Sequence, residues 1–185
     1  SAALFESPAG QPSVVAPASE DAPGVLVIDT DAATYAAVQN AVSDGRPTYW
    51  AKSLDEGLEV LTLHSVAVVI SELVLNGQRT DTALKLLKRE HPEVVTLVVT
   101  PFRDVGSLVE LINQGQIYRF LPKPVRSGPM SMSITSALRH QEKLALLPGV
   151  RAAHAVEAAT HDNDPHLAAR VMGYLSRIRK RAAAR

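Results

Sequence analysis

Short runs of apolar residues recur along most of the chain, separated by longer stretches in which apolar and polar residues mix. The runs occupy residues 25–28, 48–50, 66–70, 94–99 and 117–121. Apolar runs of this length, bounded by polar residues, are typical of strands that are buried on both faces of a sheet. The pattern therefore predicts five strands.

Between these runs, apolar residues return every three or four positions, which predicts amphipathic helices. The helices are predicted at residues 32–43, after the capping residue Ser53 with Leu54, Leu58 and Leu61 facing inward, and at residues 80–89, 105–114 and 129–146. Strands that alternate with helices predict crossover connections and a parallel sheet covered on both faces. We therefore expect an α/β domain with a doubly wound, five-stranded parallel sheet over residues 24–147.

The segments on either side of this domain have a different character. Residues 1–23 are rich in Ala, Pro and Ser, without helical or strand period, and are expected to form a flexible linker. Residues 148–185 are expected to form a C-terminal helical extension, in which Asp164-Pro165 is a helix start signal.

The predicted extension carries apolar residues at helical spacing, which we call the C-terminal stripe: Leu167, Val171, Tyr174, Leu175 and Ile178. Apolar side chains that gather on one face of a helix usually mark an interface, and self-association is the favoured use of this one. The chain ends in a basic segment, residues 177–185. We interpret it as a solvated helix end beside the negative pole of the helix dipole, in preference to a nucleic-acid contact.

Composition excludes several classes of function. The chain has 185 residues, a formal net charge of +0 and no cysteine. Bulk charge therefore draws it neither to nucleic acid nor to a membrane, and disulfides and thiolate metal sites are excluded. No apolar run approaches the roughly 20 residues that span a bilayer, and no secretory signal opens the sequence. The expected location is the cytoplasm.

Polar residues that could build a charged site follow the predicted strands. Asp29 and Glu72 come after two of the buried strands, Thr100 follows a third, and Lys123-Pro124 comes after the last. In parallel sheets of this kind, ligands bind beyond the carboxyl ends of the strands. The strand prediction therefore brings two acids, a hydroxyl and a lysine to one edge of the sheet.

This arrangement resembles the phosphorylation site of a response-regulator receiver domain. The stretch Ile117-Tyr-Arg-Phe-Leu-Pro-Lys-Pro124 is especially similar to receivers attached to cyclic-di-nucleotide phosphodiesterases and related bacterial output domains. The resemblance runs from Gly24 to about Leu146 and implies the flavodoxin-like receiver fold. It also implies a magnesium ion held by acids, an aspartate that accepts phosphate, and a hydroxyl and a lysine that stabilise the phosphoryl group.

The sequence departs from the family at three positions of this site. Thr30 stands where the family has a second metal-binding acid, and a neutral hydroxyl is a poor ligand for a hard dication. Glu72 stands at the position of the phosphate acceptor, and its extra methylene misaligns the carboxylate for in-line attack. Pro101 follows Thr100, where the family offers a backbone N–H that proline lacks.

Other positions match or offer weak substitutes. Asp29, Thr100 and Lys123 occupy family positions, and Phe120 holds the place of the switch aromatic without a hydroxyl. Asp31 could join Asp29 as a metal pair, but two solvated acids at a strand end are the favoured interpretation. We expect no cofactor and no catalytic residue.

The altered positions together predict a pseudo-receiver that keeps the fold and has lost phosphotransfer. It would act as a phosphorylation-independent interaction module of a bacterial regulatory protein, through a protein partner, an attached output domain or a second copy of the chain. One alternative is an atypical receiver that still takes phosphate in a two-component pathway. A second is a nucleic-acid-binding regulator that uses the basic end. Glu72 could either mimic a phosphorylated aspartate or form an ion pair with Lys123 in an inactive site.

Overall fold

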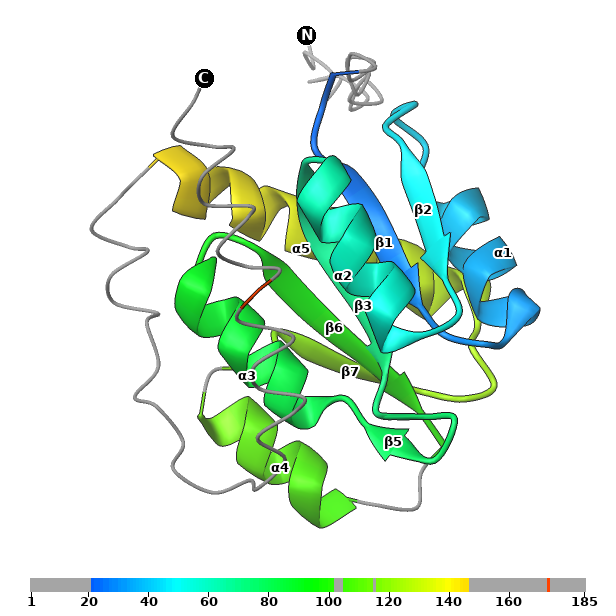
Figure 1. Cartoon of the computed structure of the whole chain (residues 1–185). Coiled ribbons are helices and arrows are strands. Elements are labelled where there is room, and N and C mark those ends of the chain that lie inside the picture. Colours follow the sequence, from blue (N-terminus) through cyan, green and yellow to red (C-terminus); the bar gives the residue numbers. More distant parts are fainter. Residues whose placement is uncertain (1–20, 102–104, 115, 147–172, 174–185) are drawn as a thin grey trace, which may run out of the picture.

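A single parallel sheet forms the centre of the protein, as seen in the computed structural model (Figure 1). The structure describes residues 21–101, 105–114, 116–146 and Gly173. The sheet has five strands in the order β2-β1-β3-β6-β7. Their bounds are β1 (Gly24–Ile28), β2 (Thr48–Ala51), β3 (Val66–Glu72), β6 (Val95–Thr100) and β7 (Arg119–Pro122). The predicted doubly wound, five-stranded sheet is confirmed.

Between residues 21 and 146, five helices cover the two faces of the sheet. They are α1 (Ala32–Ala41), α2 (Leu54–Leu63), α3 (Asp81–Glu90), α4 (Val105–Asn113) and α5 (Ser127–Leu146). Side chains of α2, α3 and α4 share one buried cluster with Leu26 and Ile28 of β1. Side chains of α1 and α5 share a second cluster with Val25 and Val27. Successive residues of a strand point to opposite faces, so β1 contributes to both layers and is buried along its whole length.

The helix boundaries follow local capping. Asp31 caps α1, because its Oδ1 accepts a hydrogen bond from the amide of Ala33 at 2.9 Å. Ser53 caps α2 as predicted and accepts from the amide of Glu56 at 3.2 Å. The helix predicted to reach residue 43 ends at Ala41, because Val42 has an extended backbone and packs against the cluster of α1 and α5.

A short hairpin, absent from the sequence prediction, follows β3. It consists of the antiparallel strands β4 (Val74–Leu75) and β5 (Gln78–Arg79). Asn76 and Gly77 form its turn, with φ of 52° and 75°. Asn-Gly in a two-residue turn with positive φ is a strong hairpin signal, so the sequence did contain the information. The buried side chains of Leu73 and Leu75 anchor the hairpin in the core.

Several predictions concern residues outside this description. The linker up to residue 20 lies outside the described residues, and so does the predicted extension apart from Gly173. The C-terminal stripe and the basic end are likewise outside. Within the described part of the chain, no helix is long and apolar enough to cross a membrane.

Candidate functional site

A lysine bonded to two acids lies at the carboxyl edge of the sheet. Lys123 follows β7, and its amide donates to the carbonyl of Thr100 at 3.0 Å, which fixes the position of the lysine beside the end of β6. The Nζ of Lys123 lies 2.8 Å from Oδ2 of Asp29 and 2.8 Å from Oε2 of Glu72. The predicted pairing of Glu72 with Lys123 is therefore present, and Asp29 shares the same ammonium group.

Asp29 is held in place from several sides. Its side chain is 2% exposed, and its Oδ1 accepts from the amide of Asp31 at 3.0 Å. Its amide donates to the carbonyl of Ala51 at 3.0 Å, which extends the pairing of β1 with β2. Its carbonyl accepts from Nε1 of Trp50 at 2.7 Å. The first acid is thus rigidly positioned by the end of the sheet.

Glu72 is bound to its own chain as well as to Lys123. Its side chain is 8% exposed, and its Oε1 accepts from the amides of Leu73 at 2.8 Å and Val74 at 3.5 Å. Those two residues begin the hairpin of β4 and β5. Because the other oxygen binds Lys123, both oxygens of Glu72 have partners, and the carboxylate connects the lysine to the base of the hairpin.

The charges of this site compensate one another. Burial by itself would lower the pKa of Lys123, but hydrogen bonds from its ammonium to Asp29 and Glu72, with their negative charges, raise that pKa above its ordinary value. The side chain of Lys123 is only 17% exposed, so little water competes for the ammonium group. The lysine therefore remains charged throughout the physiological pH range.

The structure gives each of the other predicted site residues a separate environment. Asp31 lies 3.8 Å from the Nζ of Lys123, but its side chain is 46% exposed and caps α1. Thr30 and Pro101 are exposed, whereas Thr100 is buried. Phe120 is half-buried and packs against the cluster of α2, α3 and α4.

A receiver would hold a magnesium ion here, and the residues present do not fit one. Within the ranges that the structure describes, no group of three or more His, Asp or Glu side chains is placed to bind a metal ion. Asp29 and Glu72 each give one oxygen to backbone amides and the other to Lys123. Thr30 adds no charge at the position of the second acid.

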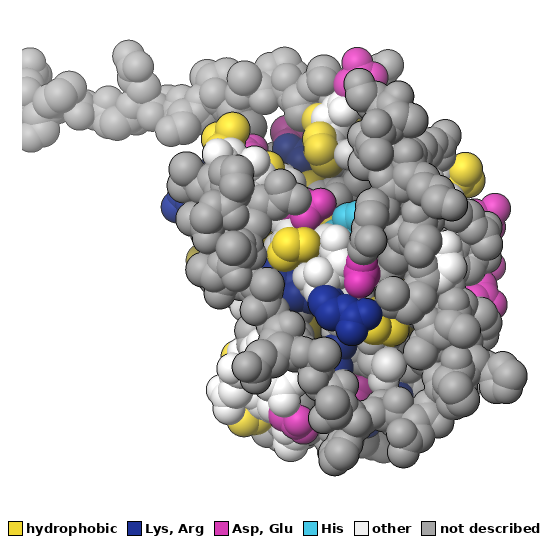
Figure 2. Space-filling view, turned by 60° about the vertical axis from the view of Figure 1, so that its left-hand side comes forward, with side chains coloured by type: hydrophobic (Ala, Val, Ile, Leu, Met, Phe, Trp, Pro, Cys, Tyr) yellow, Lys and Arg dark blue, Asp and Glu magenta, His cyan; other side chains and the backbone are white. Residues whose placement is uncertain are grey.

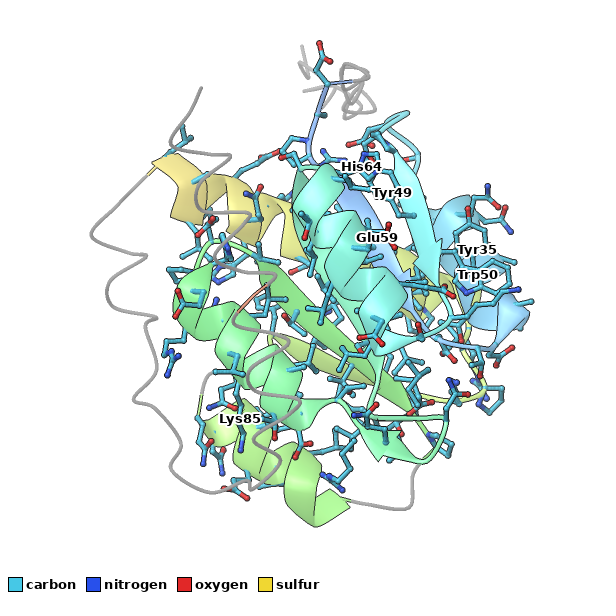
Figure 3. The ribbon with its side chains drawn as sticks, viewed as in Figure 1. Tyr35, Tyr49, Trp50, Glu59, His64 and Lys85 are labelled. Carbon is cyan, nitrogen blue, oxygen red and sulfur yellow. The ribbon has the colours of Figure 1, made fainter. Side chains whose placement is uncertain are left out.

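An aromatic group next to the site was not singled out from the sequence. Tyr35 and Trp50 stack with ring centroids 4.8 Å apart and planes at 9°. Both residues are labelled in Figure 3. The Nζ of Lys52 lies 4.6 Å from the centre of the Trp50 ring. Because the indole of Trp50 also donates to the carbonyl of Asp29, the fluorescence of Trp50 is expected to respond to changes at Asp29. In the sequence, the only sign of this group was that Trp50 is the single tryptophan of the chain and stands two residues before Lys52.

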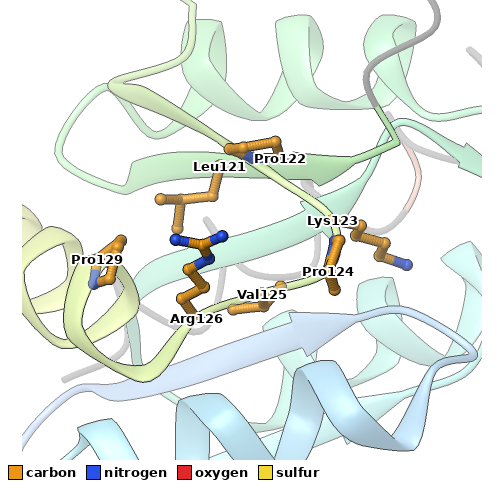
Figure 4. Close-up of a pocket in the computed structure, with 7 residues that line it drawn as sticks. All are labelled: Leu121, Pro122, Lys123, Pro124, Val125, Arg126 and Pro129. Carbon is orange, nitrogen blue, oxygen red and sulfur yellow. The ribbon is translucent and has the colours of Figure 1, made fainter.

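The loop from β7 to α5 contains a cavity of about 300 Å³ beside the site (Figure 4). Its lining comes from one short stretch of the chain: Leu121, Pro122, Lys123, Pro124, Val125, Arg126 and Pro129. In Figure 4 the amine of Lys123 points away from Arg126 and Pro129. The same amine binds Asp29 and Glu72. The Lys123–Pro124 peptide bond is cis.

Comparisons with curated proteins point to transcriptional regulators. The chain is 24% identical over 100 residues to the hydrogenase transcriptional regulatory protein HoxA of Cupriavidus necator, which is 54% of this chain and 21% of HoxA. It is 24% identical over 118 residues to the DNA-binding transcriptional regulator NtrC of Klebsiella pneumoniae, which is 63% of this chain and 25% of NtrC. The chain thus spans a quarter or less of these relatives. No protein-family model matches it.

Several solved structures with the same architecture are receiver domains. The signal receiver domain of an HD domain-containing protein from Pseudomonas fluorescens Pf-5 has a TM-score of 0.61 at 25% identity, over 72% of this chain and 98% of that one. The receiver domain of NtrX from Brucella abortus has a TM-score of 0.55 at 25% identity, over 62% and 98%. A receiver from Clostridium thermocellum has a TM-score of 0.58 at 23% identity, over 66% and 98%.

The comparisons establish the fold of the chain. The chain has the flavodoxin-like fold of a response-regulator receiver domain. Its curated relatives are larger transcriptional regulators.

Proposed function

We propose that the chain is a receiver-type module of a bacterial regulatory protein that signals without being phosphorylated. One observation carries the proposal: the ammonium of Lys123 binds both acids of the site, at 2.8 Å each, while the other oxygens of those acids accept from backbone amides. The groups that would receive and stabilise a phosphoryl group are thus engaged with one another. The module acts through protein contacts and is not an enzyme.

The geometry of Glu72 supports the proposed loss of phosphotransfer. A carboxylate nucleophile needs one free oxygen aligned with the phosphorus of the donor. Oε1 of Glu72 is turned toward the amides of Leu73 and Val74, and Oε2 is bound to Lys123. Freeing either oxygen would break a buried hydrogen bond.

Two substitutions beside the acids act in the same direction. Thr30 removes a negative charge that a bound magnesium ion would need, and Pro101 removes a donor for the oxygens of the transferred group. Each loss raises the energy of the charged transition state separately. We therefore expect the defects to combine.

Glu72 is proposed to serve as a structural ion-pair partner and not as an imitation of a phosphorylated aspartate. A phosphorylated side chain carries nearly ~2 negative charges at neutral pH, whereas a carboxylate carries one. Lys123 compensates that single charge at 2.8 Å and also compensates Asp29. With one ammonium and two carboxylates the site keeps a net charge of −1, about one unit less negative than it would be with a phosphorylated side chain in place of Glu72.

The partner is proposed to be an output domain of the same regulator or a separate protein. The curated relatives are much longer than the matched region, which supports an attached output domain. A nucleic-acid role through the basic end is less favoured. On the described part of the face in Figure 2, Lys and Arg side chains lie among acidic and apolar ones and form no large patch of a single sign.

Treatment with a phosphodonor tests the proposal. The chain would be incubated with acetyl phosphate and magnesium and its intact mass measured, while beryllofluoride binding would be followed by the fluorescence of Trp50, which touches Asp29. We expect no adduct and no saturable fluorescence change. A stoichiometric adduct on the native chain would overturn the proposal and support the atypical receiver that still takes phosphate.

Variants separate the contributions of the three altered positions. Glu72→Asp alone should not take up phosphate, because it restores the nucleophile but neither the acid at Thr30 nor the amide at Pro101. Glu72→Asp combined with Thr30→Asp and Pro101→Ala is the gain-of-function candidate. If the single variant is labelled as well as the triple one, the roles assigned to Thr30 and Pro101 are wrong.

A further inference from the structure

The turn of the β4–β5 hairpin contains a chemically labile pair that the proposed function does not use. Asn76 and Gly77 have φ of 52° and 75°, and both are exposed, as is the neighbouring Gln78. The Nδ2 of Asn76 donates to the carbonyl of Lys52 at 3.3 Å, which ties the turn to the end of β2. A methyl group at Gly77 would meet nothing within 4 Å, so the space around the turn is open, although the φ of 75° strains any residue with a side chain there.

We propose that Asn76 is a site of spontaneous deamidation that releases the hairpin turn from Lys52. The amide nitrogen of Gly77 attacks Cγ of Asn76, the Cγ–Nδ2 bond breaks, and ammonia leaves with the proton that the attacking nitrogen loses. The product is a five-membered succinimide. Water then adds to either carbonyl of the ring and gives aspartate or isoaspartate, so that the net change is consumption of water and release of ammonia.

Local structure favours the reaction at this position. Glycine has no side chain to obstruct its own nitrogen, and its backbone adopts many conformations, which allows the ring to close. The turn is flanked by strands of only two residues each, Val74–Leu75 and Gln78–Arg79. Its side-chain tie to β2 is the long bond of Asn76 to Lys52. Such exposed segments with few contacts open at low free-energy cost.

Two other asparagines in the chain serve as internal controls. Asn40 lies in α1 before Ala41, and Asn113 ends α4 before Gln114. Both are exposed, so they meet the same solvent as Asn76. The next residues carry a side chain, which hinders attack on Cγ. Ala41 also belongs to α1, and the amide of Gln114 donates to the carbonyl of Glu110 at 2.9 Å. A difference in deamidation rate between Asn76 and these two residues therefore measures the combined effect of the turn and of the following glycine.

The modification changes the surroundings of the ion-paired site. The product carboxylate has no hydrogen to donate to the carbonyl of Lys52, so the tie to β2 is lost and a negative charge is added. Lys52 also lies over the ring of Trp50, which bonds to the carbonyl of Asp29. At the other end of the hairpin, Glu72 holds the amides of Leu73 and Val74. The turn is thus connected to both acids through short series of contacts.

Ageing of the intact 185-residue chain tests the inference. Samples would be kept at 37 °C in mildly alkaline buffer, digested, and assayed by mass spectrometry for conversion of amide to acid and for isoaspartate. We expect Asn76 to convert many-fold faster than Asn40 and Asn113, with a rate that rises with pH because the attacking nitrogen must lose a proton. Equal rates at the three asparagines would overturn the proposal.

Two variants test the chemistry and its consequence. Gly77→Ala should slow conversion at Asn76 several-fold, and unchanged kinetics would argue against attack by that nitrogen. Asn76→Asp reproduces one product. Its turn amides should exchange hydrogen faster than those of the native chain, and its Trp50 emission should shift through the loss of the tie to Lys52. Native-like exchange and emission in Asn76→Asp would refute the claimed release of the hairpin.

Discussion

Replacing Lys123 by methionine tests whether the ion-paired site holds the domain together. Methionine keeps the approximate length and volume of the lysine stem but removes the ammonium that binds Asp29 and Glu72 at 2.8 Å. Two carboxylates, 2% and 8% exposed, would then lie close together without a cation. Each would keep a backbone amide as a partner, so the loss is that of the shared positive charge.

The expected cost can be estimated from the burial of these groups. Breaking a buried ion pair by removing one partner costs about 3–5 kcal/mol. That figure already includes the charge that is left unpaired, so repulsion between the two carboxylates is not added to it. Because Lys123 is 17% exposed and water can relax around its place, we expect about 3 kcal/mol in the free energy of unfolding at neutral pH.

Urea unfolding, followed by Trp50 fluorescence and by far-ultraviolet circular dichroism, would measure this loss. Glu72→Gln in the Lys123→Met chain should recover part of it, because one of the two stranded charges is removed. Lys143→Met, on the exposed face of α5, is the matched control and should change stability by less than about 0.5 kcal/mol. Strict additivity of the Lys123 and Glu72 substitutions would refute the reasoning, as would a Lys123→Met chain as stable as the control.

Three further predictions follow from other features. The raised pKa of Lys123 means that its stabilising contribution is fully present below the ordinary lysine pKa of 10.5 and is lost as the pH rises through the higher folded value. The difference in free energy of unfolding between the native chain and Lys123→Met, measured in urea, should therefore stay level up to about pH 10 and shrink above it. Gly57→Ala should destabilise the domain by about 1–2 kcal/mol in the same assay, because the new methyl would lie 2.7 Å from Cδ1 of Ile28, whereas Gly128→Ala, with nothing within 4 Å, should not destabilise it. The C-terminal stripe is predicted to mediate self-association, and sedimentation should show a larger species for the intact chain than for a truncation ending at Leu147; two monomers at high concentration would contradict this.

Much of the fold could be predicted from the sequence because it depends on patterns that are local. Buried strands of a parallel sheet are apolar along their whole length, and the helices between them show helical spacing, so the five strands and their alternation with helices were readable. Boundaries were less accurate, as for α1, whose end depends on Val42 packing against distant residues. The hairpin at Asn76-Gly77 had a clear local signal that the prediction did not use.

For the candidate site, the sequence by itself determined which chemical groups are present and at which strand ends. It identified Asp29, Glu72 and Lys123 as one site and predicted that Glu72 pairs with the lysine. Only the tertiary structure decided that Asp29 and Glu72 share the ammonium, at 2.8 Å each, and that Glu72 also holds the base of the hairpin. Sequence order cannot give these results, because hydrogen-bond partners depend on where strands β1, β3 and β7 end relative to one another, and that register is set by packing across the whole sheet.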